Sequence, residues 1–128
     1  MTSANGHGPI RVVIADDESD VRLLLRIQLE LEGFEIAGEA NDGQSAIEQC
    51  RDAQPDVVVL DLLMPGVNGF EAIPTLRRHH PDVAIVAYTA VAGDYVRKEM
   101  SRLHIPLLLK SGDVTALAAK IRELVRSV

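Results

Sequence analysis

Strand-like and helix-like segments alternate along all 128 residues of this chain, and this alternation is the feature that most restricts its fold. Short apolar or alternating runs, typical of buried and half-buried strands, occur five times. They are IRVVIA (10–15), FEIAGEA (34–40), VVVL (57–60), VAIVAY (83–88) and IPLLLK (105–110). Such an alternation predicts a parallel sheet with right-handed crossovers and helices on both faces.

A segment with helical features follows each of these five runs. The predicted helices cover residues 20–33, 44–53, a stretch after 68, 94–103 and 114–128. The last carries one apolar stripe at helical spacing, as a surface helix lying on a sheet does. We therefore predict an α/β fold, a (βα)5 doubly wound parallel five-stranded sheet with the flavodoxin-like strand order 2-1-3-4-5. Pro106 falls inside the predicted fifth strand, and the edge position that this order gives that strand tolerates proline.

Charge and composition restrict the functions that the chain can have. Its 19 acidic and 13 basic side chains give a net charge of −6, which argues against direct contact with nucleic acid. The longest aliphatic runs are four or five residues, too short to cross a membrane. Residues 1–9 lack the basic start and apolar stretch of a signal peptide, so we predict a disordered tail before one cytoplasmic domain, residues 10–128. Cys50 is the sole cysteine and is expected to be a packed thiol.

Polar residues follow the predicted strands at the points where function is expected in such a sheet, outside the carboxyl ends of the strands. An acidic group follows the first strand, a single acid the third, a hydroxyl the fourth and an amine the fifth. These residues are Asp16, Asp17, Glu18, Asp61, Thr89 and Lys110. In the predicted strand order they converge on one edge of the sheet.

The physical chemistry of that group favours phosphoryl transfer to Asp61. Two carboxylates ~4 Å apart repel by about 4 kcal/mol at an effective dielectric constant of 20. Lys110 can offset one charge and keep Asp61 ionised, and Mg²⁺, which prefers oxygen ligands, can offset the rest. Asp61 is then placed to attack a phosphoryl group, as the nucleophile of aspartyl-phosphate enzymes does. Lys110 and Mg²⁺ would stabilise the transferring group, and Thr89 would donate a hydrogen bond to it.

Each of these residues also has a purely structural interpretation. Asp17 or Ser19 could cap the first helix, Thr89 could be a turn residue, and Lys110 could be a solvated strand terminus. Each residue alone is more often structural than functional. Their occurrence together at four strand ends favours the functional interpretation.

The chain resembles the response-regulator receiver domain of two-component signalling over about residues 10–127. The resemblance lies in VVIADDE (12–18), VVVLDLLMPGVNG (57–69), AYTA (87–90) and LLLKSG (107–112). It implies that Asp61 accepts a phosphoryl group from a sensor histidine kinase or phosphotransfer protein, with Thr89 and Lys110 in the switch and phosphate-binding roles. It further implies Mg²⁺ held by Asp17, by Asp61, by the backbone carbonyl of Leu63 and, through water, by Asp16.

The same resemblance implies how the signal leaves the domain. Phosphorylation would shift the population of two states and repack the face of helix 4, strand 5 and helix 5. The partner would be a downstream protein or an output domain, the chain being a stand-alone receiver or the N-terminal part of a DNA-binding regulator. A phosphorylation-dependent homodimer is a further expected assembly. Apart from its own phosphorylation and dephosphorylation, no enzymatic activity is expected.

Among the positions at which the chain departs from the family pattern, three bear on switching and on hydrolysis of the phosphate. Leu107 stands three residues before Lys110, where the family carries an aromatic switch residue. Leu63 and Val91 lie two residues after Asp61 and Thr89, where the family tunes hydrolysis of the phosphate. Both are apolar and cannot position an attacking water, so we predict a long-lived phosphoryl group.

Three other functions compete with this one. A phosphatase of the haloacid dehalogenase type would need a second Asp where Leu63 stands. A flavin-binding domain would place a phosphate beside Asp16-Asp17-Glu18, which would repel it. A receiver-like module that signals by phosphate-independent protein binding stays open because of Leu107. The chain has no GxxxxGK loop, so we do not expect it to take phosphate from ATP unaided.

Overall fold

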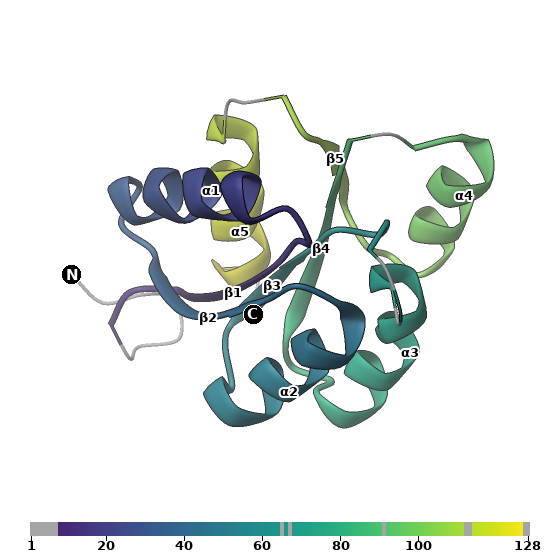
Figure 1. Cartoon of the computed structure of the whole chain (residues 1–128), viewed down its shortest axis with the longest axis horizontal. Coiled ribbons are helices and arrows are strands. Elements are labelled where there is room, and N and C mark those ends of the chain that lie inside the picture. Colours follow the sequence, from purple (N-terminus) through teal and green to yellow (C-terminus); the bar gives the residue numbers. More distant parts are fainter. Residues whose placement is uncertain (1–7, 65, 67, 91, 112–113, 127–128) are drawn as a thin grey trace.

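The sheet has five parallel strands in the order β2-β1-β3-β4-β5, as predicted. The computed structural model describes residues 8–64, 66, 68–90, 92–111 and 114–126 (Figure 1). Residues 1–7, which make up most of the predicted disordered tail, lie outside this part of the chain. The strands are β1 (Arg11–Ala15), β2 (Glu35–Ala40), β3 (Val57–Leu60), β4 (Ala84–Thr89) and β5 (Leu107–Leu109).

Five helices cover the two faces of the sheet, which confirms the doubly wound α/β prediction. They are α1 (Ser19–Leu31), α2 (Gly43–Ala53), α3 (Gly69–His79), α4 (Asp94–Arg102) and α5 (Thr115–Arg126). Figure 1 shows α1 and α5 together on one side of the strands and α2 and α3 on the other. Two separate core clusters match this division, one containing α1 and α5 residues and one containing α2, α3 and α4 residues.

The apolar runs of the central strands fill both cores because successive side chains of a strand point to opposite faces. In β3, Val57 and Val59 belong to the α1–α5 core, whereas Val58 and Leu60 belong to the other. The predicted stripe of the last helix is also confirmed over its described part. Its residues Val114, Leu117, Ala118, Ile121 and Val125 are buried, and Leu124 packs against them.

The fifth strand differs from the prediction in its start. It begins at Leu107, so Pro106 precedes the strand instead of lying inside it. Proline has no N–H to donate to a ladder, but its carbonyl can still accept, and Ala87 N donates to Pro106 O at 2.9 Å. β5 is an edge strand, as predicted, and only three residues long. None of the helices that the structure describes has the length and apolar character needed to cross a lipid bilayer.

Candidate functional site

The pairing of β1 with β3 brings two predicted acids together. Ala15, the last residue of β1, pairs with Leu60, the last residue of β3, and an aspartate follows each. Asp61 N donates to Ala15 O at 2.9 Å, which extends the pairing by one step. Because parallel strands in register end together, Asp16 and Asp61 emerge side by side at the carboxyl edge of the sheet.

Lys110 bridges these two carboxylates from the end of β5. Its Nζ lies 2.5 Å from Asp16 Oδ2 and 3.1 Å from Asp61 Oδ2. The side chains are little exposed, at 15% for Lys110, 2% for Asp16 and 6% for Asp61. Burial by itself lowers the pKa of Lys110, but hydrogen bonds to the two carboxylates and their charges outweigh it, so the pKa lies above its ordinary value. The amine therefore stays charged between the two acids.

Asp17 completes a group of three carboxylates that fits a magnesium ion. One oxygen of each of Asp16, Asp17 and Asp61 lies within 4.8 Å of the others. Hard carboxylate oxygens are the ligands that Mg²⁺ takes in proteins, and one lysine leaves the three acids with an excess of negative charge. Leu63 lies beside them, since its N–H donates to Asp61 Oδ1 at 3.1 Å while its side chain is exposed.

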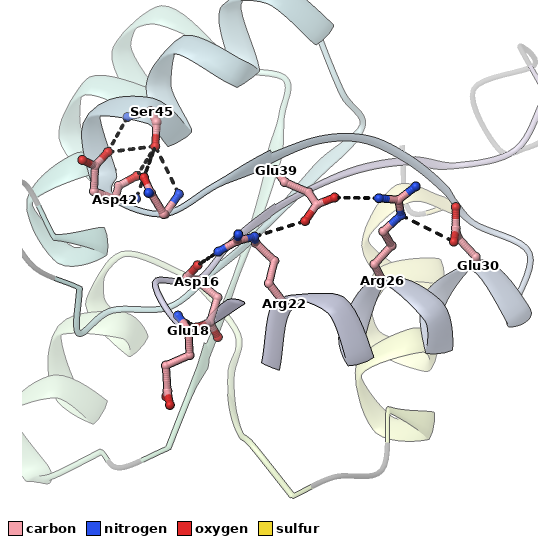
Figure 2. A network of polar contacts seen from close by, with 9 residues as sticks. Asp16, Glu18, Arg22, Arg26, Glu30, Glu39, Asp42 and Ser45 are labelled. Carbon is pink, nitrogen blue, oxygen red and sulfur yellow. Dashed lines mark hydrogen bonds and ion pairs between the residues drawn. The ribbon is translucent and has the colours of Figure 1, made fainter. Parts of the chain in front are cut away.

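Asp16 is held at its backbone as well as its side chain. Its N–H donates to Ala40 O at 3.0 Å, and its Oδ1 accepts from Glu18 N at 2.9 Å. The guanidinium of Arg22 donates to Asp16 O at 2.6 Å, as Figure 2 shows. The alternative in which Asp17 or Ser19 caps the first helix is wrong, because Glu18 is the N-cap residue of α1 and no side chain caps that helix.

Thr89 joins the site from the end of β4. It is fully buried, and its carbonyl accepts from Lys110 N at 2.8 Å, so the predicted hydroxyl and amine leave neighbouring strands together. Ala87 of the same strand pairs with Leu60, the residue before Asp61. The residues predicted for the site therefore lie at one edge of the sheet.

Sequence reasoning missed Gly69, which governs how closely α3 approaches Asp61. A Cβ at this position would lie 1.9 Å from Asp61 O and 2.8 Å from Asp61 C, a separation that real side chains do not show. Gly69 is the first residue of α3, directly after Asn68, whose side chain accepts from Glu71 N at 2.8 Å. An Asn-Gly pair soon after the Pro-Gly break was the available signal. Arg22 was also missed, and it left no signal beyond its place in the first helix.

No tyrosine takes the place of the aromatic residue that Leu107 replaces. Leu107 is half-buried and packs against the core beneath α2, α3 and α4. Tyr88 is buried in the opposite core. Tyr95 is 70% exposed on α4 and stacks on Phe70, with ring centroids 6.2 Å apart and an interplanar angle of 11°.

Comparison with known proteins identifies the family. The family model of the response regulator receiver domain matches residues 12–122. The response regulator GacA of Pseudomonas viridiflava is 38% identical over 86 residues, which are 66% of this chain and 40% of that protein. The chemotaxis protein CheY of Thermotoga maritima is 36% identical over 81 residues, 63% of this chain and 68% of that one. This chain thus spans about two fifths of the length of GacA.

A solved structure agrees in both fold and sequence. The response regulator TrrA of Thermotoga maritima, in complex with Mg²⁺-BeF, superposes with a TM-score of 0.80 at 31% identity. The match covers 90% of this chain and 98% of that one. The fold and the acidic edge of the sheet define a receiver-type domain, and the chain belongs to the response regulator receiver domain family of two-component systems.

Proposed function

We propose that this domain accepts a phosphoryl group on Asp61, in a Mg²⁺-dependent reaction, from a sensor histidine kinase or phosphotransfer protein. The observation that carries the proposal is the amine of Lys110 between Asp16 and Asp61, at 2.5 and 3.1 Å, beside the third carboxylate of Asp17. Asp16 and Asp61 are buried and Asp17 is exposed, and buried charges such as the first two are costly unless they are paired or have a task. Phosphoryl transfer supplies the task, since it needs a nucleophile with cationic partners.

The chemistry follows from the atoms that converge on the edge of the sheet. A carboxylate oxygen of Asp61 attacks the phosphorus of a phosphohistidine. The new O–P bond forms as the N–P bond breaks, and the electron pair of that bond leaves with the imidazole, which takes up a proton. Lys110 then exchanges its contact with Asp61 Oδ2 for a phosphoryl oxygen, and the Thr89 hydroxyl donates to another.

The residues that would hold Mg²⁺ are Asp16, Asp17 and Asp61, with the backbone carbonyl of Leu63 as the fourth group that the family resemblance implies. The bound cation would stabilise the negative charge on the transferring phosphoryl oxygens. The domain promotes only its own phosphorylation and dephosphorylation and acts on no other substrate.

The phosphodonor protein is proposed to dock on α1. This helix starts two residues after Asp17, and one of its faces carries large apolar side chains that are exposed. They are Leu23, Leu24, Ile27 and Leu31, which fall within about a third of the helix circumference. An exposed apolar face of this size beside the phosphoacceptor suits a protein partner in the cytoplasm better than nucleic acid or a membrane.

The signal is proposed to leave through the face of α4, β5 and α5, to a downstream protein or an output domain. Phosphorylation-dependent homodimerisation through this face is a further proposal. The TrrA complex with Mg²⁺-BeF supports a Mg²⁺-dependent receiver, and the length of GacA beyond the matched region supports signalling to an output domain. Leu107 stands where the family carries the aromatic switch residue. A movement of Thr89 caused by phosphorylation would therefore reach this face through β5, which pairs with β4.

Intact-mass spectrometry after incubation with acetyl phosphate tests the proposal. The wild-type chain should gain one phosphoryl increment when Mg²⁺ is present and none when it is chelated. The Asp61→Asn variant should gain none in either condition, and Asp52→Asn, which removes an exposed acid on α2, should behave as the wild type does. No increment on a folded wild-type chain that binds Mg²⁺ would contradict the proposal and favour phosphate-independent protein binding.

A further inference from the structure

Arg22 connects Asp16, one of the three clustered carboxylates, to the edge strand β2 through two of its own donors. Its Nη1 lies 2.6 Å from Asp16 O, and its Nε lies 3.1 Å from Glu39 Oε1. Figure 2 shows the guanidinium between the end of β1 and the strand β2 that carries Glu39. One planar side chain therefore spans α1, the residue after β1, and β2.

This contact completes the hold on Asp16. The other polar atoms of that residue are bound by Ala40 O, Glu18 N and Lys110 Nζ. The carbonyl that Arg22 binds belongs to the peptide group between Asp16 and Asp17. A fixed peptide plane restrains the backbone at both α-carbons that it joins, and the two carboxylates extend from these α-carbons.

We infer that Arg22, braced by Glu39, is a positioning residue that orients Asp16 and Asp17 for the metal. The inference rests on the proposed function, because it assigns a task to residues around the same site. Groups that orient metal ligands from outside typically change metal affinity by about 10- to 100-fold when they are removed. The prediction is a weaker magnesium site without Arg22, although removing a positive charge from beside three carboxylates would by itself strengthen cation binding.

Arg26 provides a matched control one helical turn away. Its Nη1 lies 3.1 Å from Glu39 Oε2, and its Nε lies 3.7 Å from Glu30 Oε1. It carries the same charge on the same helix and shares the acceptor Glu39, but its contacts shown in Figure 2 are with Glu39 and Glu30 alone. A difference between Arg22 and Arg26 variants therefore reports the contact with Asp16 and not the charge.

The experiment is a calorimetric titration of the unphosphorylated chain with MgCl₂. Arg22→Met should raise the dissociation constant about tenfold, and Arg26→Met should leave it within twofold of the wild type. Arg22→Lys keeps the charge but replaces the planar fork by a single point donor, so its dissociation constant should stay raised severalfold. The rate of phosphorylation by acetyl phosphate at saturating Mg²⁺ should change less than twofold in all three variants.

Several results would overturn the inference. They are tighter or unchanged Mg²⁺ binding in Arg22→Met, full recovery in Arg22→Lys, or a loss of saturated rate without a change in affinity. Should Arg22→Met fail to fold, Glu39→Met makes the same test by removing the acceptor that braces Arg22, and a dissociation constant within twofold of the wild type contradicts the inference. A wild-type chain that neither binds Mg²⁺ nor gains phosphate refutes the proposed function instead, so the two failures are distinguishable.

Discussion

At the scale of single residues, backbone geometry around Asp61 matters as much as the charges that surround it. Asp61 N is held by Ala15 O, and one of its side-chain oxygens accepts from Leu63 N. On the other side, Gly69 lets the first turn of α3 lie against the carbonyl of Asp61. The position of the proposed nucleophile therefore depends on a residue that carries no functional group.

Gly69→Ala should destabilise the fold and disturb the site together. The added Cβ would lie 1.9 Å from Asp61 O, so the backbone must move, at a cost of about 1–3 kcal/mol typical of overpacking. Urea unfolding measures this loss, and acetyl phosphate labelling measures the effect on Asp61. Gly93→Ala is the control, because a Cβ there meets nothing within 4 Å, and it should cost less than about 1 kcal/mol as an N-cap change. Equal losses of unfolding free energy in Gly69→Ala and Gly93→Ala would contradict this explanation.

With Leu63 two residues after Asp61, the phosphoryl group on Asp61 should hydrolyse slowly. Its side chain is exposed two residues after Asp61 and offers no polar atom to position an attacking water. We expect a lifetime well beyond seconds, measured by the decay of the phosphoryl mass increment after acetyl phosphate is removed. Leu63→Asn should shorten that lifetime, and a wild-type lifetime of seconds would contradict the prediction. Val91, the second residue of this argument, lies outside the described part of the chain.

Cys50 should react with thiol reagents only when the chain opens. It is fully buried on α2, and this burial raises the pKa of its thiol to about 11 from 9.0. Because the folded pKa is the higher one, the contribution of the neutral thiol to stability is complete below pH 9 and is lost as pH rises through about 11. At pH 8, labelling by a disulfide reagent should be slow and should accelerate with urea. Native labelling as fast as that of the unfolded chain would contradict this.

At the scale of elements, α1 has apolar residues on two sides with different tasks. Leu25 and Leu29 are buried against the sheet, whereas Leu23, Ile27 and Leu31 are exposed. A helix that only covered a sheet would need a single apolar stripe, as α5 has. The second apolar side supports the proposal that the phosphodonor protein docks on α1.

Replacing Leu23 and Ile27 by Gln should slow phosphoryl transfer from a sensor kinase but not from acetyl phosphate. The double variant removes exposed apolar surface without touching the carboxylates, so only docking of a protein donor should suffer, by about tenfold or more. Transfer rates from the two donors are measured side by side. Leu109→Gln, which alters a similarly exposed leucine on β5, is the control. Equal slowing with acetyl phosphate would place the effect in the site and refute the docking role.

At the scale of the whole molecule, the acidic edge of the sheet opposes folding when no cation is bound. Asp16, Asp17 and Asp61 lie close together, and the amine of Lys110 contacts Asp16 and Asp61, so the mutual repulsion of the three carboxylates is only partly offset. A ligand that binds the folded chain alone raises its stability in proportion to the logarithm of the ligand concentration. Folding and magnesium binding should therefore be coupled.

Asp61→Asn should make the metal-free chain more stable, by about 1–2 kcal/mol, because it removes one of the repelling charges. Mg²⁺ at one hundred times its dissociation constant should stabilise the wild type by about 2.7 kcal/mol and the variant much less. Urea unfolding with and without MgCl₂ measures both effects. Asp52→Asn, whose exposed carboxylate pairs with Arg51, should change stability little under either condition. A wild-type stability independent of Mg²⁺ would refute the coupling.

Most of the fold and the main side chains of the site could be predicted because they depend on local patterns. The continuous apolar run at 57–60 predicted a strand and the helically spaced apolar stripe that starts at Val114 predicted a helix, and the folded chain has them as β3 and α5. Asp61 and Lys110 follow their strands directly, so the strand order places both at one edge of the sheet, where the long side chain of Lys110 reaches Asp61. The predicted start of β5 was too early. Pro106 takes part in the pairing with β4 only through its carbonyl, which accepts from Ala87 N, and the strand itself begins at Leu107.

The sequence by itself determined the class of this protein: the alternation of strand and helix patterns predicts the doubly wound sheet, its motifs resemble those of the receiver family, and acids, hydroxyl and amine at four strand ends predict the candidate site. Only the tertiary structure decided how that site is held. The bracing of Asp16 by Arg22 and Glu39, and the approach of Gly69 to Asp61, join parts of the chain whose meeting depends on packing distances. The sequence pattern indicates which segments form strands and helices, but contacts between those segments depend on how they pack against one another.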